Sequence, residues 1–166
     1  MRQLTSLDAQ FLALEDSRNH GHVGSVAIYD PSTAPDGTLT LADLKGMLRE
    51  RLHLLTPFRW RLVQVPFSLD HPFWAEETEI DLDYHVREIA LPKPGDRRQL
   101  AEQAARIFER GLDRDHPLWE MYLIHGVDGG DHVVLLTKVH HAALDGLSGA
   151  EILVTLMDLE PTGRDI

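Results

Sequence analysis

An apolar run that ends in two adjacent histidines constrains the fold of this chain more than any other feature. Residues 133–139 have the length and the β-branched side chains of a largely buried strand. His140 and His141 follow directly, and Asp145-Gly146 then opens a helical pattern. A strand that stops at a turn places its last side chains in a crevice. The sequence therefore predicts a functional site at this strand end.

Two histidines at such a position suit proton transfer, because the imidazole takes up and returns a proton near neutral pH. Side chains alternate between the two faces of a strand, so His140 and His141 cannot both face one substrate. One is expected to be catalytic and the other structural. Asp145 could orient the imidazole or bind an arginine elsewhere, and Gly146 lets the backbone bend. A purely structural histidine pair is the alternative interpretation.

Other kinds of site are disfavoured by what the sequence lacks. The chain has no cysteine and no His-Glu-x-x-His motif, so we expect no metal site. It also has no Gly-x-Ser-x-Gly motif of a serine hydrolase and no glycine-rich phosphate-binding loop.

The motif His-His-x-x-x-Asp-Gly at residues 140–146 resembles the active-site motif of the CoA-dependent acyltransferase superfamily. Within that superfamily the chain is similar to the N-terminal part of bacterial wax ester synthases/diacylglycerol acyltransferases. Three further stretches carry this closer resemblance, in order along the chain: residues 4–11 with 22–24, residues 81–87 with 91–95, and residues 112–120 with their Pro-Leu-Trp motif.

The resemblance implies transfer of a fatty acyl group from acyl-CoA to a long-chain alcohol or a diacylglycerol. His141 matches the general base of the family, and acyl-CoA is a co-substrate, so no cofactor is expected. His140, Asp145 and Gly146 would support the motif, with Asp145 paired to an arginine. Arg59 and Arg61 are the candidate partners.

Backbone N–H groups at Gly146 and at the start of the next helix could also face developing negative charge. The residues expected to lie near the acyl channel are Pro117, Leu118, Trp119 and His22. In the simpler interpretation Trp119 packs in the core and His22 begins a strand.

The same resemblance implies a missing part. Members of the family are longer and build the active site between two similar halves. We therefore expect an N-terminal acyltransferase domain at residues 1–160 and the start of an interdomain linker at residues 161–166, with the C-terminal domain absent. The partner would be its own C-terminal domain or a second chain, and the chain alone is expected to lack full activity.

Composition fits one folded domain with a single core, since 43% of the 166 residues are hydrophobic. The lack of cysteine is compatible with the cytoplasm. No apolar stretch approaches the roughly 20 residues of a membrane span, so any contact with a membrane or lipid droplet would be peripheral. Residues 66–68 and 71–74, where a loop is expected, place aromatic side chains beside prolines. These aromatic residues could make that contact, or Phe73 and Trp74 could instead cap the core.

The net charge of −11 disfavours a nucleic-acid partner, whose phosphates bind basic surfaces. CoA also carries phosphates. Its binding would need a local cluster such as Arg97 and Arg98, or basic residues in the missing half. The alternative is that these arginines lie on a solvated helix face.

Alternating strand and helix patterns predict an α/β layered domain. This agrees with the chloramphenicol acetyltransferase-like fold that the family implies, a mixed sheet flanked by helices. Strands are expected at residues 23–29, 58–65, 84–91, 121–127 and 133–140. Helices are expected at residues 5–15, from Thr40 to about 55, from Asp96 to before Gly111, and at residues 147–159.

Two other functions stay open beside the lipid O-acyltransferase. The first is a condensation-type enzyme that takes acyl groups from a carrier protein. The second is a non-catalytic half-domain that binds lipid or a partner chain.

Overall fold

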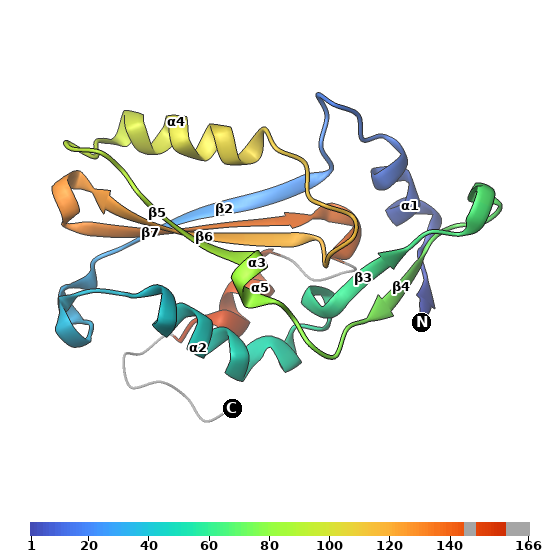
Figure 1. Cartoon of the computed structure of the whole chain (residues 1–166), viewed down its shortest axis with the longest axis horizontal. Helices are drawn as coiled ribbons and strands as arrows, with labels where there is room; N and C mark the ends of the chain where they lie inside the picture. The colour runs from blue at the N-terminus through green and yellow to red at the C-terminus, as the bar shows by residue number, and fades with distance from the viewer. Residues whose placement is uncertain (145–148, 159–166) are drawn as a thin grey trace.

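The computed structural model describes residues 1–144 and 149–158 (Figure 1). Its main element is a four-stranded sheet in the order β2-β7-β6-β5. The strands are β2 (His22–Tyr29), β5 (Val86–Ala90), β6 (Trp119–Val127) and β7 (His132–His140). Strands β5 and β6 run parallel, while β6 with β7 and β7 with β2 are antiparallel. The sheet is therefore mixed, as the predicted fold class requires.

Helices cover both faces of this sheet. Helix α4 (Arg97–Phe108) lies over one face, and α2 (Leu41–Arg51) and α5 (Gly149–Leu156) lie over the other (Figure 1). Strand β6 turns Met121 and Leu123 toward α2, whereas Tyr122 and Ile124 belong to the cluster under α4. This alternation explains why β6 and β7 have near-continuous apolar sequences, because both of their faces are buried.

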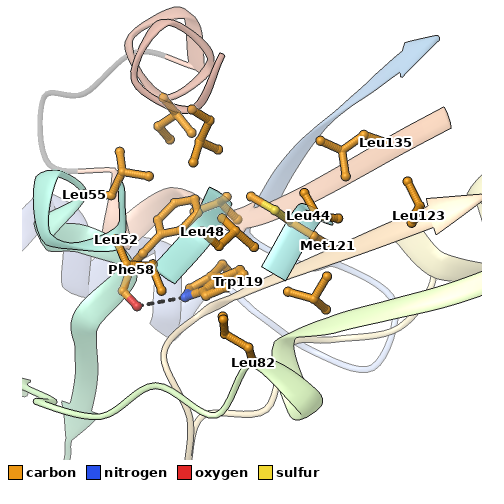
Figure 2. Close-up of a cluster of buried hydrophobic side chains, with 14 of the residues drawn as sticks. Leu44, Leu48, Leu52, Leu55, Phe58, Leu82, Trp119, Met121, Leu123 and Leu135 are labelled. Atoms are coloured by element: carbon orange, nitrogen blue, oxygen red, sulfur yellow. Dashed lines mark hydrogen bonds between the residues drawn. The ribbon is translucent and has the colours of Figure 1, made fainter. Parts of the chain in front are cut away.

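The larger core lies between the sheet and α2. Trp119 is 1% exposed, stacks on Phe58 with ring centroids 4.7 Å apart, and donates a hydrogen bond from Nε1 to the Phe58 carbonyl at 2.8 Å (Figure 2). Leucines along one stripe of α2 fill the space above them, including Leu44 and Leu48. The polar tip of the buried tryptophan thus has a partner inside the core.

Local sequence sets where the helices begin. Thr40 and Asp43 form a capping box at the start of α2, and Asp96 and Gln99 form one at the start of α4. Thr5 caps α1 (Ser6–Ala13), as its hydroxyl accepts the Asp8 N–H. The helix starts expected at these three positions agree with the structure.

A second, three-stranded sheet was not expected. It has the order β1-β4-β3, with β1 (Arg2–Gln3), β3 (Trp60–Val63) and β4 (Phe73–Glu76). The prediction of one irregular loop across residues 66–74 was wrong for its last part, because β4 pairs with both β1 and β3. Trp74 is 2% exposed and caps a core, as the simpler interpretation expected.

The other differences are small. The strand expected at residues 84–91 begins later, because Asp81 caps a short helix, α3 (Leu82–His85), before β5. The strand expected from residue 58 begins at Trp60, after a 3₁₀ turn (Thr56–Arg59). Residues 147–148 and 159 of the last expected helix lie outside the described residues. The remaining 3₁₀ turns are Pro31–Thr33, Pro35–Gly37, Leu52–Leu54, Pro66–Ser68, Asp128–Gly130 and His141–Ala143.

Within the described parts of the chain, no helix combines the length and the hydrophobicity that crossing a membrane requires.

Candidate active site

The structure separates the two motif histidines by burial. His140 is the last residue of β7 and is 1% exposed, whereas His141 begins the following 3₁₀ turn and is exposed. Backbone hydrogen bonds fix both residues from two sides. The His140 N–H donates to the Leu118 carbonyl at 2.9 Å, and the His141 N–H donates to the Gly21 carbonyl at 2.7 Å.

His141 presents an accessible ring that is held on one side. Its imidazole stacks on Phe11 of α1, with ring centroids 4.1 Å apart and an angle of 22° between the planes. The stacking restricts rotation of the ring while its exposed part stays open to a substrate. This is a geometry that a general base needs, because the nitrogen must be both reachable and oriented.

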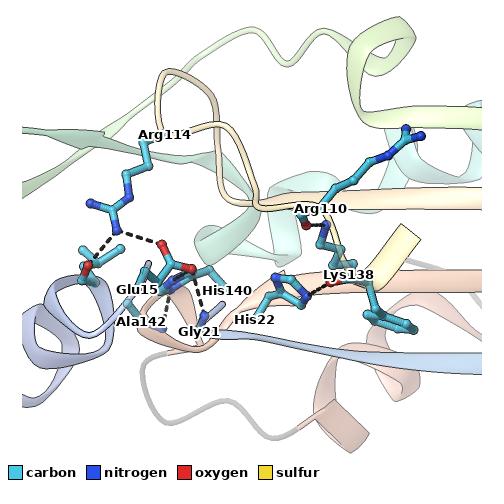
Figure 3. Close-up of polar contacts among 10 residues, drawn as sticks. Glu15, Gly21, His22, Arg110, Arg114, Lys138, His140 and Ala142 are labelled. Atoms are coloured by element: carbon cyan, nitrogen blue, oxygen red, sulfur yellow. Dashed lines mark hydrogen bonds and ion pairs between the residues drawn. The ribbon is translucent and has the colours of Figure 1, made fainter. Parts of the chain in front are cut away.

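His140 is enclosed and oriented by its own contacts (Figure 3). Its Nδ1 accepts the Ala142 N–H at 3.1 Å, and its Nε2 lies 3.0 Å from Oε1 of Glu15. The second contact is close but not well aligned for a hydrogen bond, so its effect is mainly electrostatic. Burial lowers the pKa of His140, against the opposing effect of Glu15, and the neutral imidazole is favoured.

The Pro-Leu-Trp motif lies directly behind the histidines. Leu118 and Trp119 are each 1% exposed, and Pro117 is buried as well. Leu118 packs with Ala142 and Ala143 of the histidine turn, and its carbonyl holds His140. These contacts give the motif a supporting role, and its place beside an acyl channel stays a prediction.

His22 pairs with His140 across β2 and β7. Its Nε2 lies 2.9 Å from the Phe108 carbonyl at the end of α4. Burial and the nearby Lys138 lower the pKa of His22 to about 4, so the ring is neutral at physiological pH. The His22 ring thus binds the C-terminal end of α4. Its assignment to the acyl channel also stays a prediction.

Asp145 and Gly146 lie outside the described residues, so the pairing expected for Asp145 stays a prediction. Both candidate arginines bind other carboxylates. Arg59 lies 2.8 Å from Glu76 and Arg61 lies 2.7 Å from Glu77.

Arg97 and Arg98 are also paired. Arg97 lies 3.0 Å from Asp128, and Arg98 lies 3.0 Å from Glu102 one turn along α4. Their ion pairs and their exposure are typical of a solvated helix face, and binding of CoA phosphates by this cluster stays a prediction. Among residues 1–144 and 149–158, no group of three His, Asp or Glu side chains is arranged to hold a metal ion.

The sequence did not predict the residues that contact the two histidines, Phe11, Glu15 and Gly21, nor Arg114, which binds Glu15. All four lie in or between the segments that carry the family resemblance. Their position in or between these segments was the only indication of their role in the sequence, because the contacts join positions that are far apart in the chain.

The mixed sheet with histidines at a strand end defines a class, the chloramphenicol acetyltransferase-like domains. A variant of the starter condensation domain of rhizomide synthetase shares this fold, with a TM-score of 0.70 over 93% of this chain and 36% of that chain, at 14% identity. A wax ester synthase/diacylglycerol acyltransferase from Marinobacter aquaeolei VT8 is 35% identical, with a TM-score of 0.75 over 90% of this chain and 37% of that chain.

The chain belongs to the wax ester synthase/diacylglycerol acyltransferase family, whose catalytic-domain model matches residues 4–165. A candidate diacylglycerol O-acyltransferase of Mycobacterium tuberculosis (strain ATCC 25618 / H37Rv) is 38% identical over 161 residues, which are 97% of this chain and 34% of the relative. Another from Mycobacterium bovis is 39% identical over 160 residues, with 95% and 33% covered. The chain thus spans about a third of the length of these relatives. The predicted family and fold are confirmed.

Proposed function

We propose that this chain supplies the general base of an acyl-CoA-dependent O-acyltransferase, which esterifies a long-chain alcohol to a wax ester or a diacylglycerol to triacylglycerol. The observation that carries the proposal is the exposed ring of His141, stacked on Phe11 and fixed through its backbone to Gly21. Family membership supplies the reaction class, and the chain's own geometry supplies the candidate base.

In the proposed reaction His141 takes the proton from the acceptor hydroxyl as its oxygen attacks the thioester carbonyl. The C–S bond of the tetrahedral intermediate then breaks, and the imidazolium returns its proton to the CoA thiolate. The products are the ester and free CoA. No acyl-enzyme forms, and acyl-CoA is the co-substrate, so the reaction uses no cofactor.

The experiment measures CoA release from palmitoyl-CoA with hexadecanol or dipalmitoylglycerol as acceptor. It uses this chain alone and this chain extended by the C-terminal half that its relatives carry. His141→Ala in the extended protein is expected to lower acceptor-dependent release by about a hundredfold or more, because general-base catalysis contributes typically 10² to 10⁴.

His132→Ala is the matched control, because His132 lies at the opposite end of the same strand and forms a half-buried pair with Asp128 at 2.9 Å. The acceptor-dependent CoA release of this variant should stay within about twofold of the wild-type value. Release by the His141→Ala variant equal to that of the control would remove the proposed base. Absence of release from free acyl-CoA, with turnover of a carrier-bound acyl group instead, would replace the lipid-ester function by a condensation reaction.

We further propose peripheral contact of a cytoplasmic enzyme with a membrane or lipid droplet, where both lipid acceptors reside. The hairpin between β3 and β4 supports this location. Its tip exposes Phe67 and Leu69, which are 92% and 80% exposed. The C-terminal half, as part of the same protein or as a second chain, would be the other partner.

A further inference from the structure

The carboxylate of Glu15 lies next to His140, and both of its oxygens make polar contacts. Oε1 accepts the Gly21 N–H at 2.8 Å and lies 3.0 Å from Nε2 of His140. Oε2 accepts a hydrogen bond from Arg114 at 2.7 Å. The Glu15 side chain is 13% exposed, and Arg114 also donates to the Leu12 carbonyl in the last turn of α1 (Figure 3). The carboxylate thus joins α1, the start of β2 and the segment before the Pro-Leu-Trp motif.

These contacts set the state of the His140 ring. Nδ1 accepts the Ala142 N–H, so the proton of the neutral ring is on Nε2, which faces Glu15. The ring is 1% exposed and cannot touch a substrate. Its role is to hold the backbone on which the next residue, His141, is carried.

The same short segment also reaches His141 directly. Gly21, whose N–H is held by Glu15, accepts the His141 N–H with its carbonyl. Phe11, four residues before Glu15, stacks on the His141 ring. The ring and the backbone of the candidate base are therefore both positioned by residues 11–21.

We infer that Glu15 is a positioning residue for His141, and that Arg114 is the charge partner that keeps Glu15 in place. The inference rests on the proposed function, because it takes His141 as the base. Glu15 touches no reacting atom. It acts by fixing the orientation of His140 and the peptide of Gly21, between which the His141 backbone is held.

The charges agree with this assignment. Burial by itself would raise the pKa of Glu15, but hydrogen bonds from Arg114 and Gly21, with the nearby His140, outweigh it and lower the pKa. Glu15 is therefore ionised at neutral pH and balances the guanidinium of Arg114. A neutral side chain at position 15 would leave that guanidinium, whose own side chain is 39% exposed, without its carboxylate.

The test compares Glu15→Ala and Glu15→Gln. Glutamine can keep an oxygen toward Gly21 and His140 while losing the charge that Arg114 binds, whereas alanine removes all three contacts. The matched control is Glu88→Gln, because Glu88 forms a similar glutamate–histidine pair with His125 at 2.8 Å, on β5 and β6 away from the site.

Two measurements are made on each variant. The first is kcat and KM for acyl-CoA in the extended protein. The second is the ¹⁵N and ¹H NMR spectrum of the histidine rings in this chain, which reports the tautomer of His140 and the ring-current shift that Phe11 causes on His141. The backbone amide spectrum shows for each variant that the fold is kept.

We expect kcat to fall by about 10- to 100-fold in Glu15→Ala, with KM changed less than twofold, because a small misplacement of a catalytic group has an effect of this size. The kcat of Glu15→Gln should lie between those of the wild type and Glu15→Ala, and the kcat of Glu88→Gln should match that of the wild type. In Glu15→Ala the His140 Nε2 signals should shift, because the N–H loses the carboxylate that faces it, and the His141 signals should move as well.

If Glu15→Ala does not fold, Glu15→Gln and Arg114→Met test the same contact with a smaller loss of stability. Wild-type kinetics and ring spectra in folded Glu15 variants would overturn the inference. An extended wild-type protein without turnover would count against the proposed function, while the ring spectra would still decide whether Glu15 positions the two histidines.

Discussion

Gly21 shows how little space surrounds the motif histidines. A Cβ atom at this position would lie 2.8 Å from Nε2 of His140 and 3.2 Å from the Phe11 carbonyl. The first distance is shorter than real Cβ atoms show, and the second is tighter than most Cβ contacts. A side chain at position 21 would therefore force the His140 ring to shift.

Gly21→Ala is expected to destabilise the fold by about 1 to 3 kcal/mol, the usual effect of overpacking a core. It should also reduce CoA release in the extended protein, because the displaced His140 ring moves the chain before His141. Urea unfolding measures the first effect. Gly46→Ala is the control, since its Cβ would meet no atom within 4 Å and alanine favours the helix α2. Equal unfolding midpoints for the two variants would contradict this account.

Of the residues in the candidate site, the sequence predicted the two histidines. His140 and His141 follow a strand pattern, and alternation of side chains predicted that only one of them faces outward. Glu15 and Arg114 could not be predicted in this way, because each is an ordinary charged residue in its own segment. Their role arises only when the fold brings the two segments together with β7.

The C-terminal end of α4 shows how one element is tied to the sheet. A helix leaves its last carbonyls without partners, and here side chains from the sheet bind them. Nζ of Lys138, which is 0% exposed, donates to the carbonyls of Ile107 and Arg110, and His22 binds the carbonyl of Phe108. Burial lowers the pKa of Lys138, partly offset by the charge of Glu120.

Lys138→Met keeps the length of the side chain but leaves the carbonyls of Ile107 and Arg110 without this donor. We expect a loss of about 2 kcal/mol in the free energy of unfolding, measured in urea, because an unpaired buried polar group costs about 1 to 3 kcal/mol. Lys45→Met is the control, since Lys45 pairs with Asp83, which is 90% exposed, and such pairs contribute about 1 kcal/mol or less. A loss at Lys138 no larger than that at Lys45 would show that the carbonyls find other partners.

Elements were predictable where local signals were strong. Capping residues predicted the starts of α1, α2 and α4, and apolar runs predicted β6 and β7. Strand β4 was missed because Pro66 and Pro72, which precede it, indicate a loop. Its strand conformation depends on pairing with β1 and β3, which no local pattern reveals.

For the whole molecule, the described residues form a large layered part and a smaller part at one end of it (Figure 1). The sheet and its two helical layers bury the apolar runs, while α1 and the β3–β4 hairpin lie side by side at one end (Figure 1). Ser6 and His71 connect the two through a contact of 3.3 Å, and the Leu4 N–H donates to the Pro72 carbonyl at 2.9 Å. The helix that contacts His141 is therefore also attached to the hairpin, and lipid contact at the hairpin would lie on the same side as the candidate base.

The tip of that hairpin provides a test of the proposed lipid contact. Phe67 adopts a φ of 58°, a left-handed conformation that costs a bulky residue roughly 1 to 2 kcal/mol, yet its side chain is 92% exposed. Leu69 is 80% exposed beside it. Neither side chain gains stability by packing in this domain, so we expect both to gain it by entering lipid.

The double variant Phe67→Ser, Leu69→Ser should reduce the fraction of protein that floats with phosphatidylcholine vesicles. Burial of a Phe or Leu side chain contributes about 1.5 to 3 kcal/mol, so the partition coefficient is expected to fall roughly a hundredfold or more. Leu54→Ser is the control, because Leu54 is 45% exposed in a 3₁₀ turn beyond α2. A chain with a net charge of −11 has little electrostatic attraction to such vesicles, so binding should persist in high salt. Flotation that the double variant retains, or that salt abolishes, would assign the contact to another surface.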